Sequence, residues 1–569
     1  MTQVRYALLL IVWLFSLPAG ASDNKNQAAI ASAHPLATEA GFEILQQDGN
    51  AFDAAIAVSA ALAVVEPTGS GLGGGGFWLL HQGDSGQQIM LDGRETAPAA
   101  AHRDMYLNAN QQVEKTWSLD GPLAAAIPGV PAALAHLSQN YGRLPLSQSL
   151  APAIRYAEQG FKVSTHYQQM AMFRLNALKK SPAASQLFLL NNSVPPLNHL
   201  IKQTDLANTL KQLAHHGRAG FYQGDVAQKL VAGVKKAGGI WTLDDLRHYH
   251  VKERPVVMEQ YHDYQISSAA LPSSGGIVLS LILNQLEQFD LASYSTAQQR
   301  HLIIEAMRRA YFDRSRYLGD SDFVQIPPRL TTKNYANKLA DTIDPNHASS
   351  SAKLSSPAVA KGEDTTHFSI IDQEGNRVAA TLSINYPFGS AFVAPETGVL
   401  LNDEMDDFSA KAGTANVYGL VGNEANAIAP GKRPLSSMTP TFIENDQHLM
   451  VIGTPGGSRI ITMVLLGILD FIEGQSASDI VAAPRFHHQY LPDEVQLEHN
   501  GFSRSEQLAL QNFGHQLKIL TRQYGNMQLI TYNKKTQKFD VASDPRGEGM
   551  ADIRCIKATN QIRLLPGSN

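Results

Sequence analysis

The stretch that decides the architecture of this chain is Lys361-Gly362-Glu363-Asp364-Thr365-Thr366-His367-Phe368-Ser369-Ile370-Ile371-Asp372. From His367 to Ile371 the residues favour a β-strand, with Phe368 and Ile370 on one face and Ser369 on the other. Polar residues at the end of an otherwise apolar strand need partners. The start of this strand is therefore a candidate functional site.

The next residues predict a hairpin. Residues 372–376, Asp-Gln-Glu-Gly-Asn, have the composition of a turn, and Arg377 to Asn385 suits a second strand. A hairpin folded about Glu374–Gly375 pairs positions whose numbers sum to roughly 749. This pairing brings Ser383–Asn385 back beside Thr365.

The segment before Thr365 has a different composition. Pro345 to Asp364 is rich in Ser, Ala, Asn, Lys and Pro, which predicts an exposed, flexible loop. Such a loop ending at a polar strand tip suits self-cleavage before Thr365. The freed α-amine, with an unperturbed pKa of about 8, could then accept the proton of the Thr365 hydroxyl. Taken alone, these residues also fit an ordinary strand start rich in β-branched side chains.

The segment Asp364-Thr365-Thr366-His367-Phe368-Ser369 resembles the processing motif of the gamma-glutamyltranspeptidases, which are N-terminal nucleophile hydrolases. The resemblance extends from about Ala31 to Pro545-Arg546, and it is the order of several motifs that makes it specific. The further matching segments are Gly69–Phe77, Gly93–Pro98, Asn402–Ser409, Asn416–Gly422, Lys432–Pro440 and Gly453–Arg459.

The resemblance implies a fold and a division of the chain. The pattern of the sequence alone indicates a mixture of α and β structure, whereas the family implies an α+β, four-layer αββα sandwich. After a signal peptide over residues 1–21, residues 22–364 would form a large subunit and residues 365–569 a small catalytic subunit. Both pieces would form one intertwined heterodimer, cut between Asp364 and Thr365.

The resemblance also implies an activity. The expected enzyme is a gamma-glutamyltransferase and glutathione hydrolase that forms a γ-glutamyl ester on Thr365 and passes the acyl group to water, an amino acid or a peptide. Its partners would be these small molecules, and no cofactor or metal is expected. Thr366 is the rival nucleophile if processing falls one bond later.

The site residues carried over by resemblance fall into three groups. Gly456 and Gly457 would hold the oxyanion, which agrees with their place between a strand-like and a helix-like segment. Ser383 would orient Thr365, and Tyr418 would lie near the substrate on a lid formed by Lys411 to Lys432. The donor α-carboxylate would be bound by Arg94, Ser436 and Ser437, and its α-ammonium by Asn385, Glu404 and Asp407.

Two of these positions depart from the family pattern. Ser383 stands where family members often carry Thr, and Glu404 stands where some relatives carry Gln. The extra negative charge of Glu404 is expected to favour an ammonium. Without the resemblance, Arg94 would be interpreted as a surface charge and Asn402 to Asp407 as a solvated turn.

Composition excludes some classes of function. The net charge is −5 with no long basic run, so no nucleic-acid partner is expected. Cys555 is the single cysteine, which rules out an intrachain disulfide. The adjacent pairs His215-His216 and His487-His488 do not face one metal, because neighbouring helix residues diverge.

The N-terminus predicts export. Met1 to Ala21 has a basic start, a short apolar run and an A-x-A end, so cleavage after Ala21 and a periplasmic or secreted location are expected. An uncleaved N-terminal anchor is the alternative. No later segment is long and apolar enough to suggest a stable membrane span.

Alternative functions remain open at this point. A related glutaryl- or cephalosporin-type acylase would act on side chains without an α-ammonium, which Asp407 argues against. A poly-γ-glutamate hydrolase would need a more open cleft than a lid allows. From a different class, a secreted amino-acid-binding protein would use Arg94 and Asp407 only to hold its ligand and would remain one chain.

Overall fold

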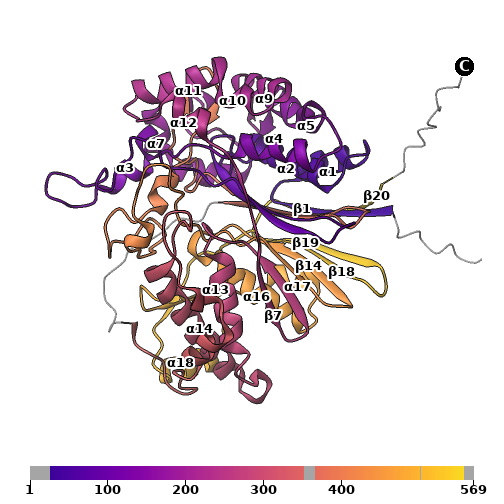
Figure 1. Ribbon diagram of the computed structural model, residues 1–569, viewed down its shortest axis with the longest axis vertical. Helices are drawn as coiled ribbons and strands as arrows, with labels where there is room; N and C mark the ends of the chain where they lie inside the picture. Colours follow the sequence, from indigo (N-terminus) through magenta and orange to yellow (C-terminus); the bar gives the residue numbers. More distant parts are fainter. Residues whose placement is uncertain (1–25, 352–364, 500, 557–569) are drawn as a thin grey trace, which may run out of the picture.

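The computed structural model describes residues 26–351, 365–499 and 501–556. Within them, two sheets lie face to face, and each is covered by helices on its outer side (Figure 1). This is the four-layer αββα sandwich that the resemblance implied, so the predicted fold class is confirmed. The predicted signal peptide, its cleavage site, Asp364 and most of the Pro345–Asp364 segment lie outside the described residues.

The first sheet interleaves the two halves of the chain. In the described residues it has seven strands in the order β20-β1-β9-β10-β2-β3-β6, all antiparallel. Strands β9, β10 and β20, from beyond Thr365, therefore pair with β1 and β2 from before it. The bounds are β1 Gln27–Ser32, β2 Gly75–His81, β3 Gln88–Asp92, β6 Lys252–Arg254, β9 Thr366–Ile371, β10 Arg377–Ser383 and β20 Met550–Cys555.

The predicted hairpin is formed by β9 and β10, with a register one position from that expected. Paired residue numbers sum to 748, as for His367 with Thr381. The loop is a three-residue one centred on Glu374, with Gly375 at φ +82°, and not a two-residue turn. The Asp372 carboxylate shapes it by accepting hydrogen bonds from the backbone N–H groups of Glu374 and Asn376 at 2.9 and 3.0 Å. Ser383 consequently lies directly opposite Thr365.

The second sheet has six strands in the described residues, in the order β19-β18-β14-β13-β8-β7. Its bounds are β7 Val257–Tyr261, β8 Tyr264–Ser268, β13 Thr441–Glu444, β14 His448–Gly453, β18 Gln528–Asn533 and β19 Lys538–Ser543. The β7–β8 hairpin lies within a part of the chain that is otherwise mostly helical. Its alternating residues and the His262-Asp263 turn were the missed signal.

The two sheets pack through small and apolar side chains. Ala29, Phe77 and Ile371 of the first sheet meet Phe442 and Val451 of the second. Between them, Ser369 of β9 donates a hydrogen bond to the carbonyl oxygen of Gln528 at 3.1 Å. The predicted alternation is confirmed, because Phe368 and Ile370 point to the opposite face and join the core under the helices.

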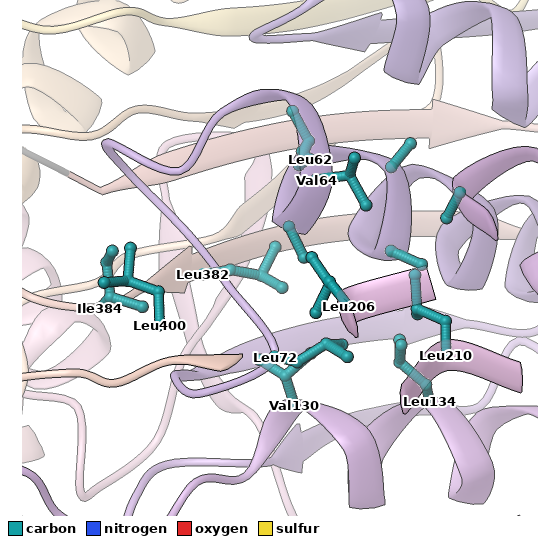
Figure 2. Close-up of a cluster of buried hydrophobic side chains, with 14 of the residues drawn as sticks. Leu62, Val64, Leu72, Val130, Leu134, Leu206, Leu210, Leu382, Ile384 and Leu400 are labelled. Carbon is teal, nitrogen blue, oxygen red and sulfur yellow. The ribbon is translucent and has the colours of Figure 1, made fainter. Parts of the chain in front are cut away.

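The helices form the two outer layers. Leu62 and Val64 of α2 pack with Leu206 of α9 over Leu382 of β10 (Figure 2). The first layer contains α1 Pro35–Leu45, α2 Ala51–Val65, α4 Val130–Asn140, α5 Leu146–Gln159, α9 Thr204–His216, α10 Ala219–Tyr222, α11 Gly224–Lys236 and α12 Leu243–His248. The second contains α13 Gly275–Leu286, α14 Thr296–Tyr317, α15 Lys333–Ala340, α16 Ile460–Ile472, α17 Ala477–Ala482 and α18 Arg504–Asn512.

Shorter elements complete the described chain. They are α3 Lys115–Leu119, α6 Thr165–Phe173, α7 Leu175–Lys180, α8 Pro182–Phe188, β4 Phe161–Lys162, β5 Leu200–Ile201, β11 Val393–Ala394, β12 Val399–Leu400, β15 Phe486–His487, β16 Val495–Leu497 and β17 Leu517–Ile519. Among the described residues, no helix combines the length and the apolarity needed to cross a bilayer.

Candidate active site

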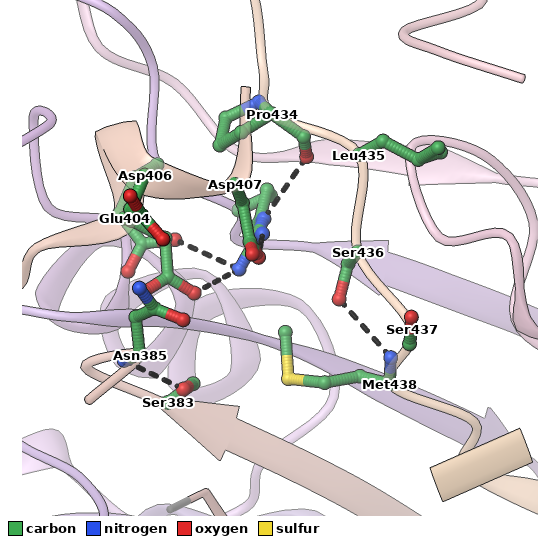
Figure 3. A network of polar contacts seen from close by, with 12 residues as sticks. Ser383, Asn385, Glu404, Asp406, Asp407, Pro434, Leu435, Ser436, Ser437 and Met438 are labelled. Atoms are coloured by element: carbon green, nitrogen blue, oxygen red, sulfur yellow. Dashed lines mark hydrogen bonds and ion pairs between the residues drawn. The ribbon is translucent and has the colours of Figure 1, made fainter. Parts of the chain in front are cut away.

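Thr365 lies at one end of the first sheet, immediately before β9. Its side-chain oxygen is 3.4 Å from that of Ser383, and only 7% of its surface is exposed. The Ser383 oxygen accepts a hydrogen bond from the backbone N–H of Asn385 at 2.8 Å (Figure 3). The hairpin thus joins the three residues that the sequence predicted to meet at its tip.

Two cavities border Thr365. The smaller, of about 20 Å³, is lined by every residue predicted for the site except Gly456, which directly precedes its lining residue Gly457. The larger, of about 230 Å³, is lined by Thr365 together with Glu66, Ser164, Met170 and Asn526 among others. Thr366 is fully buried and lines neither of these cavities.

Arg94 lies inside the protein and is not a surface charge. Its Nε donates a hydrogen bond to the carbonyl oxygen of Pro434 at 3.1 Å. Its Nη2 lies 2.5 Å from Asp407 Oδ2, and its Nη1 pairs with Glu404. The Tyr249 hydroxyl holds the backbone of this residue by donating to the Arg94 carbonyl oxygen at 2.8 Å. Arg94 therefore forms ion pairs with two carboxylates that line the same small cavity.

The small cavity contains more buried carboxylates than cations. Burial raises the pKa of Glu404 and of Asp407, although Arg94 opposes both shifts. Burial also raises the pKa of Glu95, whose carboxylate lies 3.8 Å from Arg94 Nη1. For Arg94, burial alone would lower the pKa, but the surrounding carboxylates raise it above its ordinary value. An additional cation in the cavity would relieve this excess of negative charge.

The cluster Asn402 to Asp407 is not the solvated turn that its composition alone suggests. Asn402, Asp403 and Glu404 are at most 1% exposed. Asn402 accepts hydrogen bonds from two backbone N–H groups, of Ala126 and Glu404. Burial raises the pKa of Asp406 to about 6, although its carboxylate accepts hydrogen bonds from Ser118 and from the Val417 backbone. Packing around this cluster fixes the direction of Glu404 and Asp407.

Ser436 and Ser437 are held by a second loop. The Ser436 backbone donates to Pro272 and accepts from the N–H of Ser274 at 2.9 Å, and the Ser274 hydroxyl donates to the same carbonyl oxygen at 2.7 Å. Arg314 Nη2 donates to the Ser437 hydroxyl at 3.0 Å. The loop that contains Ser273 and Ser274 therefore holds the Ser436–Ser437 backbone in place.

Arg314 is a site residue that the sequence reasoning missed. It lies on α14, and its guanidinium is buried beside Ser274 and Ser437. Burial lowers its pKa. The available signal was its position four residues after the buried Ala310, on the inner face of the helix.

Gly456 and Gly457 begin the turn that leads into α16. Their φ angles are +142° and +56°, which favour glycine. Neither backbone N–H meets an acceptor in the described part of the chain. A Cβ on Gly457 would lie 2.4 Å from Cδ1 of Tyr418, so a side chain does not fit there. Two donors near a helix start can bind a developing oxyanion.

The segment predicted to be a lid covers the small cavity. Asn416 donates a hydrogen bond to Asp407 Oδ1 at 3.1 Å, and the Tyr418 hydroxyl donates to the Asn385 carbonyl oxygen at 2.6 Å. Tyr418 is buried. The cavity is therefore closed on this side by contacts with the residues that line it.

His487 and His488 have hydrogen-bond partners within the protein. His487 lies 2.8 Å from Thr462 and 2.8 Å from Gln489, and burial lowers its pKa to about 3. Among the described residues, a different cluster contains His301, Glu305 and His515. One potential metal-ligand atom of each residue lies within 4.8 Å of the others. Sequence reasoning missed it because His515 is remote in sequence. Glu305 there forms ion pairs with Arg308 and Arg309.

Comparisons with known proteins agree with this geometry. The family model described as gamma-glutamyltranspeptidase matches residues 37–553. The glutathione hydrolase proenzyme of Pseudomonas sp. (strain A14) is 43% identical over 522 residues, covering 90% of each chain. The one from Escherichia coli (strain K12) is 41% identical, covering 91% of this chain and 90% of the relative.

Solved structures give the same fold. A cephalosporin acylase from Bacillus halodurans matches with a TM-score of 0.82 at 26% identity, covering 95% of this chain and 99% of that one. A chain of Helicobacter pylori gamma-glutamyltranspeptidase matches with a TM-score of 0.55 at 41% identity. The match covers 56% of this chain and 92% of the Helicobacter pylori chain.

Proposed function

We infer that this chain, which belongs to the gamma-glutamyltranspeptidase family, is a self-processing glutathione hydrolase that also transfers γ-glutamyl groups. The observation that carries the inference is the small cavity, in which a strand-tip threonine meets one arginine, two carboxylates and a serine pair. The relatives at 41–43% identity over about 90% of the chain are both named as proenzymes of this activity.

Maturation is proposed to cut the chain between Asp364 and Thr365. The Thr365 oxygen attacks the Asp364 carbonyl, the peptide C–N bond breaks, and the nitrogen of Thr365 leaves as its α-amine. Water then hydrolyses the ester. Residues 22–364 and 365–569 would remain together as a heterodimer. The partial coverage by the Helicobacter pylori chain supports an enzyme of more than one chain.

The choice of Thr365 over Thr366 rests on the alternation of the strand. Thr365 borders both cavities and lies opposite Ser383, whereas Thr366 is buried on the helix side. A nucleophile must reach a substrate atom within hydrogen-bonding range of its base. This position supports Thr365 as the nucleophile.

In the mature enzyme, Thr365 would attack the γ-carbonyl carbon of a glutamyl amide. Its own α-amine accepts the hydroxyl proton as the new C–O bond forms. The N–H groups of Gly456 and Gly457 stabilise the oxyanion. The C–N bond then breaks, the leaving nitrogen takes the proton, and the γ-glutamyl ester is transferred to water or to an amine. Ser383, at 3.4 Å, orients the nucleophile.

Donor recognition follows from the charges in the small cavity. The donor ammonium would bind between Glu404, Asp407 and Asn385, where its positive charge would offset the excess of negative charge. The donor α-carboxylate would then bind Arg94, Ser436 and Ser437. Arg94 presents a planar fork suited to a carboxylate, and Arg314 orients the Ser437 hydroxyl. Binding would therefore exchange ion pairs within the protein for ion pairs with the donor.

An acylase for substrates without an ammonium is the second candidate. The cephalosporin acylase shares the fold, but a glutaryl side chain would leave the excess carboxylates of this cavity uncompensated. Export of the mature enzyme to the periplasm or beyond is proposed on the N-terminal sequence alone.

The test is a denaturing gel of the purified mature protein with N-terminal sequencing of the smaller band. Wild-type protein and a Thr366→Ala control should give two bands, the smaller starting at residue 365, whereas Thr365→Ala should stay uncut. The processed enzyme should release p-nitroaniline from its γ-glutamyl anilide and not from its glutaryl anilide. A single band in active wild-type protein would overturn the proposal.

A further inference from the structure

Glu66 is a half-buried residue beside the backbone of Thr365 whose Oε2 atom is enclosed, and the proposed reaction does not use it. It directly follows α2 and lines the larger cavity together with Thr365. A Cβ built on Gly69 would lie 3.1 Å from the Thr365 carbonyl oxygen and 3.5 Å from the Glu66 carboxyl carbon. The carboxyl group of Glu66 and the main chain of Thr365 are thus neighbours across Gly69.

The carboxyl group has an incomplete set of partners. Its Oε2 is buried and has no hydrogen bond of ordinary geometry in the described part of the chain. Burial raises the pKa of Glu66 to about 8, the Thr366 hydroxyl opposes that shift, and Glu548 adds to it. An uncompensated acceptor of this kind is costly unless a donor occupies the site in the working molecule.

The other charged groups of the cavity do not provide that donor. They are His34, Lys162, His166, Arg522, Arg546 and Glu548. Burial lowers the pKa of both His34 and His166, so these rings are neutral near pH 7. Arg546 is paired with Glu498 and Asp544, and Lys162 and Arg522 are exposed. The phenols of Tyr167 and Tyr524 complete the titratable set.

Cleavage before Thr365 would create a donor in the right place. In extended backbone, the N–H and C=O of one residue point to the same edge of the strand, as the paired exchange in antiparallel sheets shows. The Thr365 carbonyl oxygen lies nearer to a Cβ built on Gly69 than its carbon does, and the Glu66 carboxyl group approaches the same position. The α-amine released at Thr365 is therefore directed to the same side. The hydroxyl of Thr366 interacts with Glu66, and adjacent strand residues point to opposite faces, so Glu66 approaches Thr365 from the face opposite its hydroxyl.

We propose that Glu66 binds the α-amine of mature Thr365, holds it toward the hydroxyl, and balances the positive charge that the amine acquires when it accepts the hydroxyl proton. This inference rests on the proposed function. Glu66 touches no substrate atom and is a positioning residue. Its part resembles that of a carboxylate that orients a catalytic base and stabilises the protonated base.

The proton balance is simple. The Thr365 hydroxyl proton moves to the α-amine while the Thr365 oxygen bonds to the γ-carbonyl carbon. The resulting ammonium is stabilised by Glu66 until its proton passes to the leaving nitrogen. Two groups that interact this closely titrate as a pair. Removing the carboxylate should therefore lower the pKa of the amine.

The test compares Glu66→Gln with Glu548→Gln, which removes an exposed carboxylate from the mouth of the same cavity. The gel should show normal processing of both variants. With γ-glutamyl p-nitroanilide, Glu66→Gln should keep its KM within about twofold and lose about 10- to 100-fold in kcat. The acidic limb of its kcat/KM profile should move to lower pH. Glu548→Gln leaves the Glu66 carboxylate in place, so it should process normally and change KM and kcat by less than about twofold.

A direct measurement of the pKa of the Thr365 amine keeps the proposal testable even if one variant misfolds. Competitive acylation of the Thr365 amine at several pH values, read by mass spectrometry of the N-terminal peptide, gives the pKa of the amine. A lower pKa in Glu66→Gln or Glu66→Asp than in wild type is expected. An equal pKa, an unchanged kcat with an unchanged acidic limb, or a precursor that folds but no longer processes would overturn the assignment. Wild-type protein that is uncut or inactive would instead refute the proposed function itself.

Discussion

Arg94 illustrates how burial decides the meaning of a single residue. Its side chain is 1% exposed and lies between Glu404 and Asp407, so its planar fork contacts both carboxylates at once. A lysine at this position would keep the positive charge but would lose the planar guanidinium that reaches both carboxylates. The first prediction tests that geometry.

We expect Arg94→Lys to lower kcat/KM for γ-glutamyl p-nitroanilide by about 100-fold, mainly through KM, because a buried bidentate contact is lost. Steady-state kinetics of the processed enzyme provide the measurement. The matched control is Arg103→Lys, whose guanidinium pairs with Glu424 at the surface and should change kcat/KM less than twofold. Equal effects of the two variants would contradict the role of Arg94.

Glu404 should make donor binding depend on pH. Burial raises the pKa of this carboxyl to about 7, although Arg94 opposes the shift. A bound ammonium favours the ionised form, so donor binding should tighten as the pH rises through 7 and weaken below it. In Glu404→Gln this dependence should flatten. The check is the donor KM between pH 6 and 8, and a wild-type KM that does not change over this range would contradict the prediction.

Asp470 gives a stability prediction remote from the site. Burial, reinforced by Glu473, raises its pKa to about 6, so the ionised form is destabilised in the folded protein. This cost is absent below the unfolded pKa, grows as the pH rises, and is complete above the folded pKa. Asp470→Asn should therefore raise the unfolding free energy by about 1–2 kcal/mol at neutral pH and not at pH 4. Denaturant unfolding at both pH values tests this, with activity as the control.

At the level of elements, the site forms where the hairpin tip, the turn before α16 and the lid meet. Gly457 and Tyr418 are in contact there, and a Cβ on Gly457 would overlap the Tyr418 ring. The turn and the lid are thus coupled by packing. A side chain at Gly457 must displace one of them.

Gly457→Ala should lower kcat/KM by about 100-fold, because both the oxyanion donor and the lid are moved. In Gly457→Ala/Tyr418→Ala the space of the ring is free. The combined loss should then be smaller than the product of the two single losses, as expected of residues in contact. Fully multiplicative losses would show that the lid and the turn act independently.

At the scale of the molecule, the proposed cleavage would not divide the core. Strand β1 lies between β20 and β9, and β2 pairs with β10, so strands from before and after Thr365 lie side by side within one sheet. The apolar core beneath the first helix layer also draws on both parts. Separating the pieces would expose this core and leave strand edges unpaired.

The processed protein should therefore elute as one species in native size-exclusion chromatography while giving two bands on a denaturing gel. In urea, the loss of tertiary structure and the separation of the pieces should coincide. Uncut Thr365→Ala is the control for elution volume. Pieces that separate before the fluorescence transition would show that the two parts fold independently.

The sequence alone was sufficient for the hairpin, the alternation of β9 and the turn before α16, because these depend on local composition and period. The order of motifs also indicated the family, and through it the site residues, which then lined one cavity. Arg314, the β7–β8 hairpin and the pairing of Arg94 with two carboxylates were not foreseen. These features depend on which distant segments pack together and on how much water the packing excludes. A local sequence pattern predicts neither. The charge of a carboxyl such as Glu66 or Glu404 is likewise set by burial, which only the tertiary structure decides.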